Sequence, residues 1–206
     1  MINGEAARRK VATAFAEAVD ELVRDRMDGL VEEPDITSRL GQRLEDRFDG
    51  QILAGHRVRV ISETVTSHGR GSLEKPLGAD LYVALSVEDA CGLTTTKGVL
   101  IQAKRRDRLD PAGLSKQCRR MMHVTRKGSV AWIYTRTGVD VVRATDTTKK
   151  EWPVLSASQF FDAVLKCTLG DLRRVPNGSF GNRRALKAML EKMGADNAIW
   201  LELQEQ

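Results

Sequence analysis

Three side chains at the ends of two predicted strands have the types and spacing needed for phosphate chemistry. Asp80 opens an apolar strand over residues 81–87. Gln102 and Lys104 lie two residues apart and close a second apolar strand. A carboxylate and an amide carbonyl are oxygen ligands that suit Mg²⁺, and an ammonium stabilises the negative charge that develops on an attacked phosphate. These groups could therefore support metal-assisted hydrolysis of a phosphodiester bond, in which the metal lowers the pKa of the attacking water.

An antiparallel hairpin would bring these three side chains together. If the chain folds back about Gly92, Asp80 lies opposite Lys104. The same pairing puts Tyr82 opposite Gln102. Because side chains at positions i and i+2 of a strand share one face of the sheet, we expect the three polar groups to converge at the open end of the hairpin.

With Gly78-Ala79 before Asp80 and the Gln-x-Lys pattern of Gln102 and Lys104, the chain resembles the PD-(D/E)xK nuclease superfamily, in particular the Gln-x-Lys branch of Mrr-like restriction endonucleases. The resemblance covers about residues 32–143. It implies metal-dependent hydrolysis of nucleic acid, most often double-stranded DNA, and suggests a role in restriction or defence against foreign DNA. The sequence departs from the pattern of this superfamily at two positions. No proline directly precedes Asp80, and Gln102 stands where an acidic residue is commoner. Because glutamine carries no negative charge, we expect it to weaken metal affinity in the absence of substrate.

Further ligands are expected around the metal, which we take to be Mg²⁺ or Mn²⁺. The backbone carbonyl of Ala103 follows Gln102 directly and supplies another oxygen. The resemblance also implies a glutamate on the first core helix, for which Glu33 and Glu45 are the candidates and Glu33 is preferred. Glu74, six residues before Asp80, either reaches the metal or is an ordinary loop residue. Which glutamate completes the site stays open at this point.

The basic residues are concentrated beside the expected site. The whole chain carries a net charge of +5, with an isoelectric point near 9.3. Residues 104–127 contain nine basic and two acidic residues, a local charge of +7 that suits a phosphate backbone or, alternatively, a solvated helix face. The expected nucleic-acid contacts are Arg105, Arg106, Gln117, Arg119 and Arg120.

Hydrophobic periodicity predicts an α/β fold: a restriction-endonuclease-like core with a mixed central sheet flanked by helices, an N-terminal helix and a C-terminal helical extension. The expected divisions are an N-terminal helix over 1–30, the core over 31–145, and an extension over 146–206 that packs on the core. The predicted helices are 5–27, 34–48, 110–124, 156–169 and 182–193. The predicted strands are 57–65, 81–87, 99–104, 130–134, 139–142 and a short terminal strand over 199–201.

Composition narrows the class of protein. With 41% hydrophobic and 30% charged residues, the chain is typical of a globular domain, and no apolar stretch approaches the ~20 residues of a membrane span. The N-terminus lacks the plan of a secretion signal, so we expect a cytoplasmic protein without a membrane partner. The three cysteines are too scattered for a disulfide framework or a zinc knuckle. A catalytically inactive nuclease fold that serves as a nucleic-acid-binding or scaffold subunit is the alternative function, and a homodimer or a partner protein is possible in either case.

Overall fold

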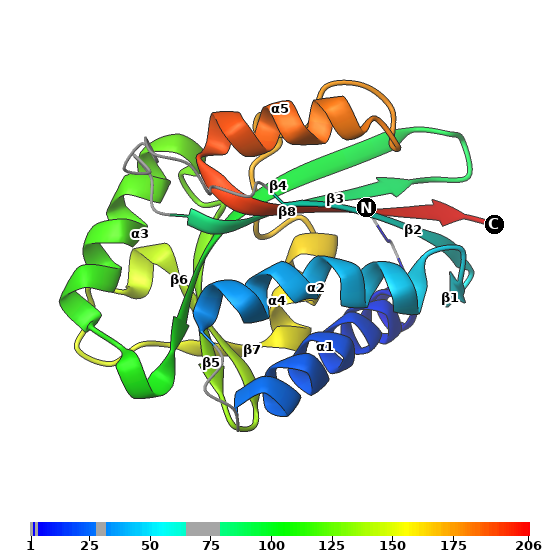
Figure 1. The fold of residues 1–206 in the computed structure, drawn as a ribbon. Coiled ribbons are helices and arrows are strands. Elements are labelled where there is room, and N and C mark those ends of the chain that lie inside the picture. The colour runs from blue at the N-terminus through cyan, green and yellow to red at the C-terminus, as the bar shows by residue number, and fades with distance from the viewer. Residues whose placement is uncertain (1, 3, 28–31, 65–78) are drawn as a thin grey trace.

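The computed structural model describes residues 2, 4–27, 32–64 and 79–206, and these form an α/β fold with one mixed sheet between two layers of helices (Figure 1). The strand order is β1-β2-β8-β3-β4-β5-β6-β7. The strands are β1 (Ile52–Leu53), β2 (His56–Thr64), β3 (Ala79–Glu88), β4 (Thr94–Arg105), β5 (Ser129–Thr135), β6 (Gly138–Arg143), β7 (Val154–Ser156) and β8 (Ala195–Glu205). The helices are α1 (Glu5–Met27), α2 (Glu33–Phe48), α3 (Pro111–Thr125), α4 (Ala157–Leu165) and α5 (Arg183–Met193), with short 3₁₀ turns η1 (Arg106–Arg108) and η2 (Ala144–Asp146).

The helices divide between the two faces of the sheet, which confirms the predicted α/β class and mixed sheet. Helices α1, α2 and α4 pack on one face, and α3 and α5 pack on the other (Figure 1). Helix α2 shows why the periodicity predicted it correctly, since Ile36, Leu40, Leu44 and Phe48 recur every four residues and all are buried. Among the described helices, none combines the length and apolar character that crossing a membrane requires.

The hairpin of β3 and β4 has a different register from the one expected. Leu81 pairs with Ile101 and Tyr82 with Leu100, so the predicted pairing of Tyr82 with Gln102 about Gly92 is wrong by two residues. The predicted pairing of Asp80 with Lys104 fails for the same reason. A shift of two residues leaves every side chain on its original face, so the three polar groups still share a face of the sheet.

The turn between these strands explains the shift. Its five residues run from Asp89 to Leu93, and the carboxylate of Asp89 accepts hydrogen bonds from the backbone N–H groups of Cys91 at 3.0 Å and Leu93 at 2.9 Å. This side-chain capping centres the turn on Cys91. Gly92 is instead the residue in the left-handed region, with φ of +77°.

The C-terminal strand is longer and more central than predicted. Instead of a short terminal strand over 199–201, β8 spans Ala195–Glu205 and lies between β2 and β3, antiparallel to the first and parallel to the second. Residues beyond 145 therefore form part of the same sheet as the predicted core, rather than only an extension packed on it. Its partners lie more than a hundred residues earlier in the chain, so local sequence did not indicate its place.

The segment after α4 is attached to the middle of β4. Gly98 and Asp171 exchange two backbone hydrogen bonds, of 3.0 and 2.9 Å. The neighbouring Lys97 is 5% exposed, and its ammonium donates to the carbonyls of Cys167 at 2.7 Å and Leu169 at 3.2 Å. These contacts hold the segment against the middle of β4, six to seven residues before Lys104.

Substituting Gly98 tests this attachment. A Cβ there would overlap the backbone carbonyl of Arg174 and lie 2.9 Å from the hydroxyl of Tyr82, so Gly98→Ala is expected to lower the free energy of unfolding by about 2 kcal/mol. Gly4→Ala is the control, because its Cβ would meet only an ordinary contact at 3.7 Å. Urea unfolding followed by circular dichroism measures both, and equal midpoints would contradict the contact.

Candidate active site

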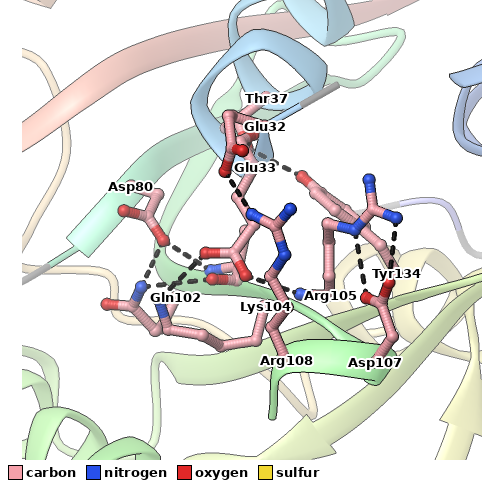
Figure 2. A network of polar contacts seen from close by, with 11 residues as sticks. Glu32, Glu33, Thr37, Asp80, Gln102, Lys104, Arg105, Asp107, Arg108 and Tyr134 are labelled. Atoms are coloured by element: carbon pink, nitrogen blue, oxygen red, sulfur yellow. Dashed lines mark hydrogen bonds and ion pairs between the residues drawn. The ribbon is translucent and has the colours of Figure 1, made fainter. Parts of the chain in front are cut away.

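The polar groups singled out in the sequence lie together where β3 begins and β4 ends. Figure 2 shows Asp80 on β3, Gln102 and Lys104 on β4, and Glu33 in the first turn of α2, all pointing toward one another. The pairing of β3 with β4 ends at Leu81 and Ile101, so Asp80 and Gln102 lie just beyond the last paired residues.

The carboxylate of Asp80 joins the two strands at this point. Its Oδ2 atom accepts a hydrogen bond from the backbone N–H of Ala103 at 2.7 Å and another from Nε2 of Gln102. The backbone carbonyl of Asp80 accepts from Nδ2 of Asn197, on β8, at 3.1 Å. Asp80 is therefore fixed from both neighbouring strands, with its carboxylate on the β4 side (Figure 2).

Gln102 has one polar atom satisfied and one that is not. The side chain is 1% exposed, and Nε2 also donates to the carbonyl of Ala103 at 3.3 Å. Its Oε1 atom is buried without a hydrogen-bond partner among the described residues. A buried acceptor left in this way costs about 1–3 kcal/mol, and turning Oε1 toward the carboxylate of Asp80 becomes favourable only if a cation lies between them.

This donor set fits a hard cation. It combines a carboxylate oxygen of Asp80, the orphaned amide oxygen of Gln102 and the adjacent carbonyl of Ala103, and such oxygens suit Mg²⁺ or Mn²⁺. The part of the chain that the structure describes has no cluster of three His, Cys, Asp or Glu residues able to hold a metal. Two of the expected ligands, an amide and a backbone carbonyl, do not belong to these four residue types. Glu74, the remaining expected ligand, lies outside the described residues.

Glu33 rather than Glu45 approaches the end of β4. One oxygen of Glu33 lies 3.0 Å from Nζ of Lys104, and the other accepts the backbone N–H of Arg105 at 2.8 Å. The side chains of Glu33 and Lys104 are 19% and 25% exposed, so the pair is partly screened by solvent. Glu45, three turns further along α2, accepts from Ser62 at 2.8 Å and does not belong to the site.

A buried pair of hydroxyl groups supports the first turn of α2, and the sequence did not indicate it. The hydroxyl of Thr37 donates to the backbone carbonyl of Glu33 at 2.9 Å and lies 2.9 Å from the hydroxyl of Tyr134 on β5. Burial raises the pKa of the Tyr134 hydroxyl far above its usual value, so it stays protonated and acts through hydrogen bonding alone. The position of Thr37, one turn after Glu33 on the buried side of the helix, is the feature of the sequence that could have indicated this support.

Two further ion pairs lie at the end of β4 and in η1. Arg108 contacts Glu32 at 2.6 Å, and its hydrogen bond and charge lower the pKa of that carboxyl. Arg105 contacts Asp107 at 3.0 Å and lowers the pKa of Asp107 in the same way. Glu32 and Glu33 thus connect the start of α2 to the end of β4 and to η1 (Figure 2).

A cavity of about 540 Å³ lies between the start of α2 and the first half of α3. Its walls carry four basic side chains and three acidic ones, together with Gln117: Lys104, Arg108, Lys116 and Arg120, and Glu32, Glu33 and Asp110.

Two of the predicted nucleic-acid contacts, Gln117 and Arg120, therefore lie beside the candidate site. Arg119 is exposed on the same helix but does not line the cavity. Arg105 and Arg106 line a different cavity, of about 320 Å³, and the Arg105 side chain is buried. Arg105 and Arg106, which we expected to contact nucleic acid together with Gln117 and Arg120, therefore lie in a different cavity from these two residues.

Comparison of the chain with protein-family models, with curated proteins and with solved structures gave no match. The contacts at the end of β4 are therefore the basis of the functional interpretation.

The hydroxyl pair beneath Glu33 predicts that removing one hydroxyl lowers the free energy of unfolding more than removing the other. Thr37→Val removes the partner of a buried hydroxyl and is expected to cost about 1–3 kcal/mol of unfolding free energy. Tyr134→Phe removes the hydroxyl itself and leaves Thr37 bonded to Glu33, so it is expected to cost about 1 kcal/mol or less. Denaturant unfolding of both variants measures the difference. A larger loss for Tyr134→Phe than for Thr37→Val would contradict this account of the support.

Proposed function

We propose that this chain is a metal-dependent nuclease that hydrolyses phosphodiester bonds in DNA and has a restriction-endonuclease-like core. The convergence of Asp80, Gln102 and Lys104 on one face, beside a cavity that Lys116, Gln117 and Arg120 line from α3, is the observation that carries the proposal. The order α2, β2, β3, β4, α3, β5 supports it, because this is the order of elements that the resemblance to the PD-(D/E)xK superfamily implies.

The residues of the chain would divide the chemical work. Asp80, Gln102 and the carbonyl of Ala103 would hold Mg²⁺ or Mn²⁺, which when bound supplies a water of lowered pKa and neutralises charge on the phosphate. Lys104 would donate to a phosphate oxygen and stabilise the charge that develops there. Glu33 holds that ammonium at 3.0 Å and thereby restricts its position.

The cavity walls supply the groups that would hold a substrate phosphate next to the scissile one. Lys116 and Arg120 are cations one turn apart on α3, and Gln117 between them offers an amide N–H. Contacts of this kind fix the register of a nucleic-acid backbone without reading its sequence.

One observation favours the alternative of a nucleic-acid-binding subunit without turnover. The Asp80 carboxylate already accepts from Gln102 and Ala103, so the local network holds together through hydrogen bonds within the protein. In that case DNA binding would be salt-sensitive, as expected for phosphate contacts, while cleavage would not respond to metal.

Cleavage of plasmid DNA with Mg²⁺ or with EDTA tests the proposed activity. Lys104→Met and Asp80→Asn are each expected to slow cleavage by about 10²–10³-fold, because each removes a group that acts on the transition state. Lys10→Met and Asp25→Asn are the matched controls, since both lie exposed on α1.

Two results would count against this assignment. Cleavage by Lys104→Met at the wild-type rate would remove Lys104 from the site. DNA binding by the wild type without cleavage under any metal would favour the inactive subunit instead.

A thermal readout tests metal binding without relying on activity. Gln102→Glu places a second carboxylate beside Asp80, so in EDTA the variant is expected to melt roughly 3–6 °C below the wild type. Mg²⁺ should recover most of this loss, because a ligand that binds the native state raises stability. Gln117→Glu adds the same charge on α3 and serves as control. A melting temperature of Gln102→Glu that ignores Mg²⁺ would contradict the metal site.

A further inference from the structure

The exposed side of α3 carries cations that have no acidic partner among the described residues. Helix α3 contains no Asp or Glu, and Lys116, Arg119 and Arg120 are exposed on it. Arg126 and Lys127 follow directly after its last residue and are exposed as well. None of these five side chains lies within 4.0 Å of a carboxylate in the described ranges of the chain.

Among the described residues, several arginines on other helices, unlike those of α3, form ion pairs with carboxylates. Arg47 on α2 pairs with Glu21 at 2.5 Å, and Arg183 on α5 pairs with Glu63 at 3.0 Å. Unpaired cations on one surface repel one another, and the repulsion is relieved when an external polyanion binds. We name the five unpaired residues the α3 stripe.

The spacing of the stripe suits a linear ligand. Lys116 and Arg120 lie four residues apart, and the exposed His123 follows three residues later, so the three share one side of the helix. Arg126 and Lys127 follow the end of α3, where Arg126 leaves the helical conformation with φ of +49°. The 15 residues of α3 extend about 22 Å, which matches the axial rise of about six base pairs of a DNA duplex.

A second cavity, of about 450 Å³, lies at the far end of the stripe. Arg126 and Lys127 line it from the α3 side, and Lys97 and Arg173 line it from β4 and the segment after α4. Lys97 is occupied by two backbone carbonyls, and Arg173 contacts Asp171 at 2.6 Å. Arg126 and Lys127 are therefore the cations left to meet a phosphate there.

We propose that the α3 stripe and this second cavity form an extended binding site for the phosphate backbone of double-stranded DNA, reaching from the candidate active site to the opposite end of α3. This inference rests on the proposed nuclease function and specifies its substrate as a duplex long enough to contact both cavities. Sites for single strands combine cations with aromatic side chains on which bases stack. No Phe, Tyr or Trp occurs in α3 or among the described residues that line the second cavity, which favours a duplex read through its backbone.

Binding in EDTA tests the site separately from catalysis. Fluorescence anisotropy would measure the affinity of a duplex of about 20 base pairs at salt concentrations from about 50 to 200 mM. The double variant Arg126→Ala/Lys127→Ala is expected to bind about tenfold more weakly, with the slope of log K against log salt reduced by about 1.8. Lys10→Ala/Lys166→Ala is the control, because it removes the same charge from exposed positions on α1 and at the end of α4.

The outcomes separate this inference from the proposed function. Equal slopes for the two double variants would overturn the extended site even if the wild type cleaves DNA. If Arg126→Ala/Lys127→Ala reduces the slope but the wild type never cleaves DNA, the result would support the extended site and overturn the proposed nuclease function. Tighter binding of a single strand than of the duplex, or equal displacement of the duplex by polyglutamate, would also overturn it.

Discussion

The candidate site depends on one carboxylate at the point where two strands stop pairing. Beyond Leu81 and Ile101, the N–H of Ala103 is satisfied by the side chain of Asp80 instead of by the backbone of β3. The same oxygen accepts a hydrogen bond from the side-chain amide of Gln102. The carboxylate therefore takes the place of the backbone hydrogen bonds that β3 and β4 no longer make, and it also fixes the position of the Gln102 side chain. A charged group is stable there because it accepts several hydrogen bonds, and a cation could share those oxygens.

Charge is balanced differently on the two sides of this carboxylate. Toward α2, the acidic residues Glu32 and Glu33 neutralise Arg108 and Lys104, which fixes the helix start against β4. Toward α3, the cations of the stripe have no such partners within the described part of the chain. Paired charges thus hold the protein together on one side, and on the other side the cations of the stripe would be available to the DNA backbone that we propose as ligand.

Sequence patterns predicted what depends on local chemistry. The four-residue spacing from Ile36 to Phe48 predicted α2, and the parity of Asp80, Gln102 and Lys104 predicted their common face. The register was wrong because the side chain of Asp89 decides the turn. The place of β8 was missed because its pairing with β2 and β3 depends on contacts distant in sequence, and buried polar residues such as Glu202 interrupt its apolar pattern.

The most direct test of the central claim is the anomalous scattering of Mn²⁺ in crystals of the protein. The account predicts a peak at about 2.0–2.3 Å from a carboxylate oxygen of Asp80 and from the side-chain oxygen of Gln102, with the amide turned from its present orientation. An unchanged hydrogen bond between Gln102 and Asp80 at saturating Mn²⁺, with no peak beside them, would contradict it.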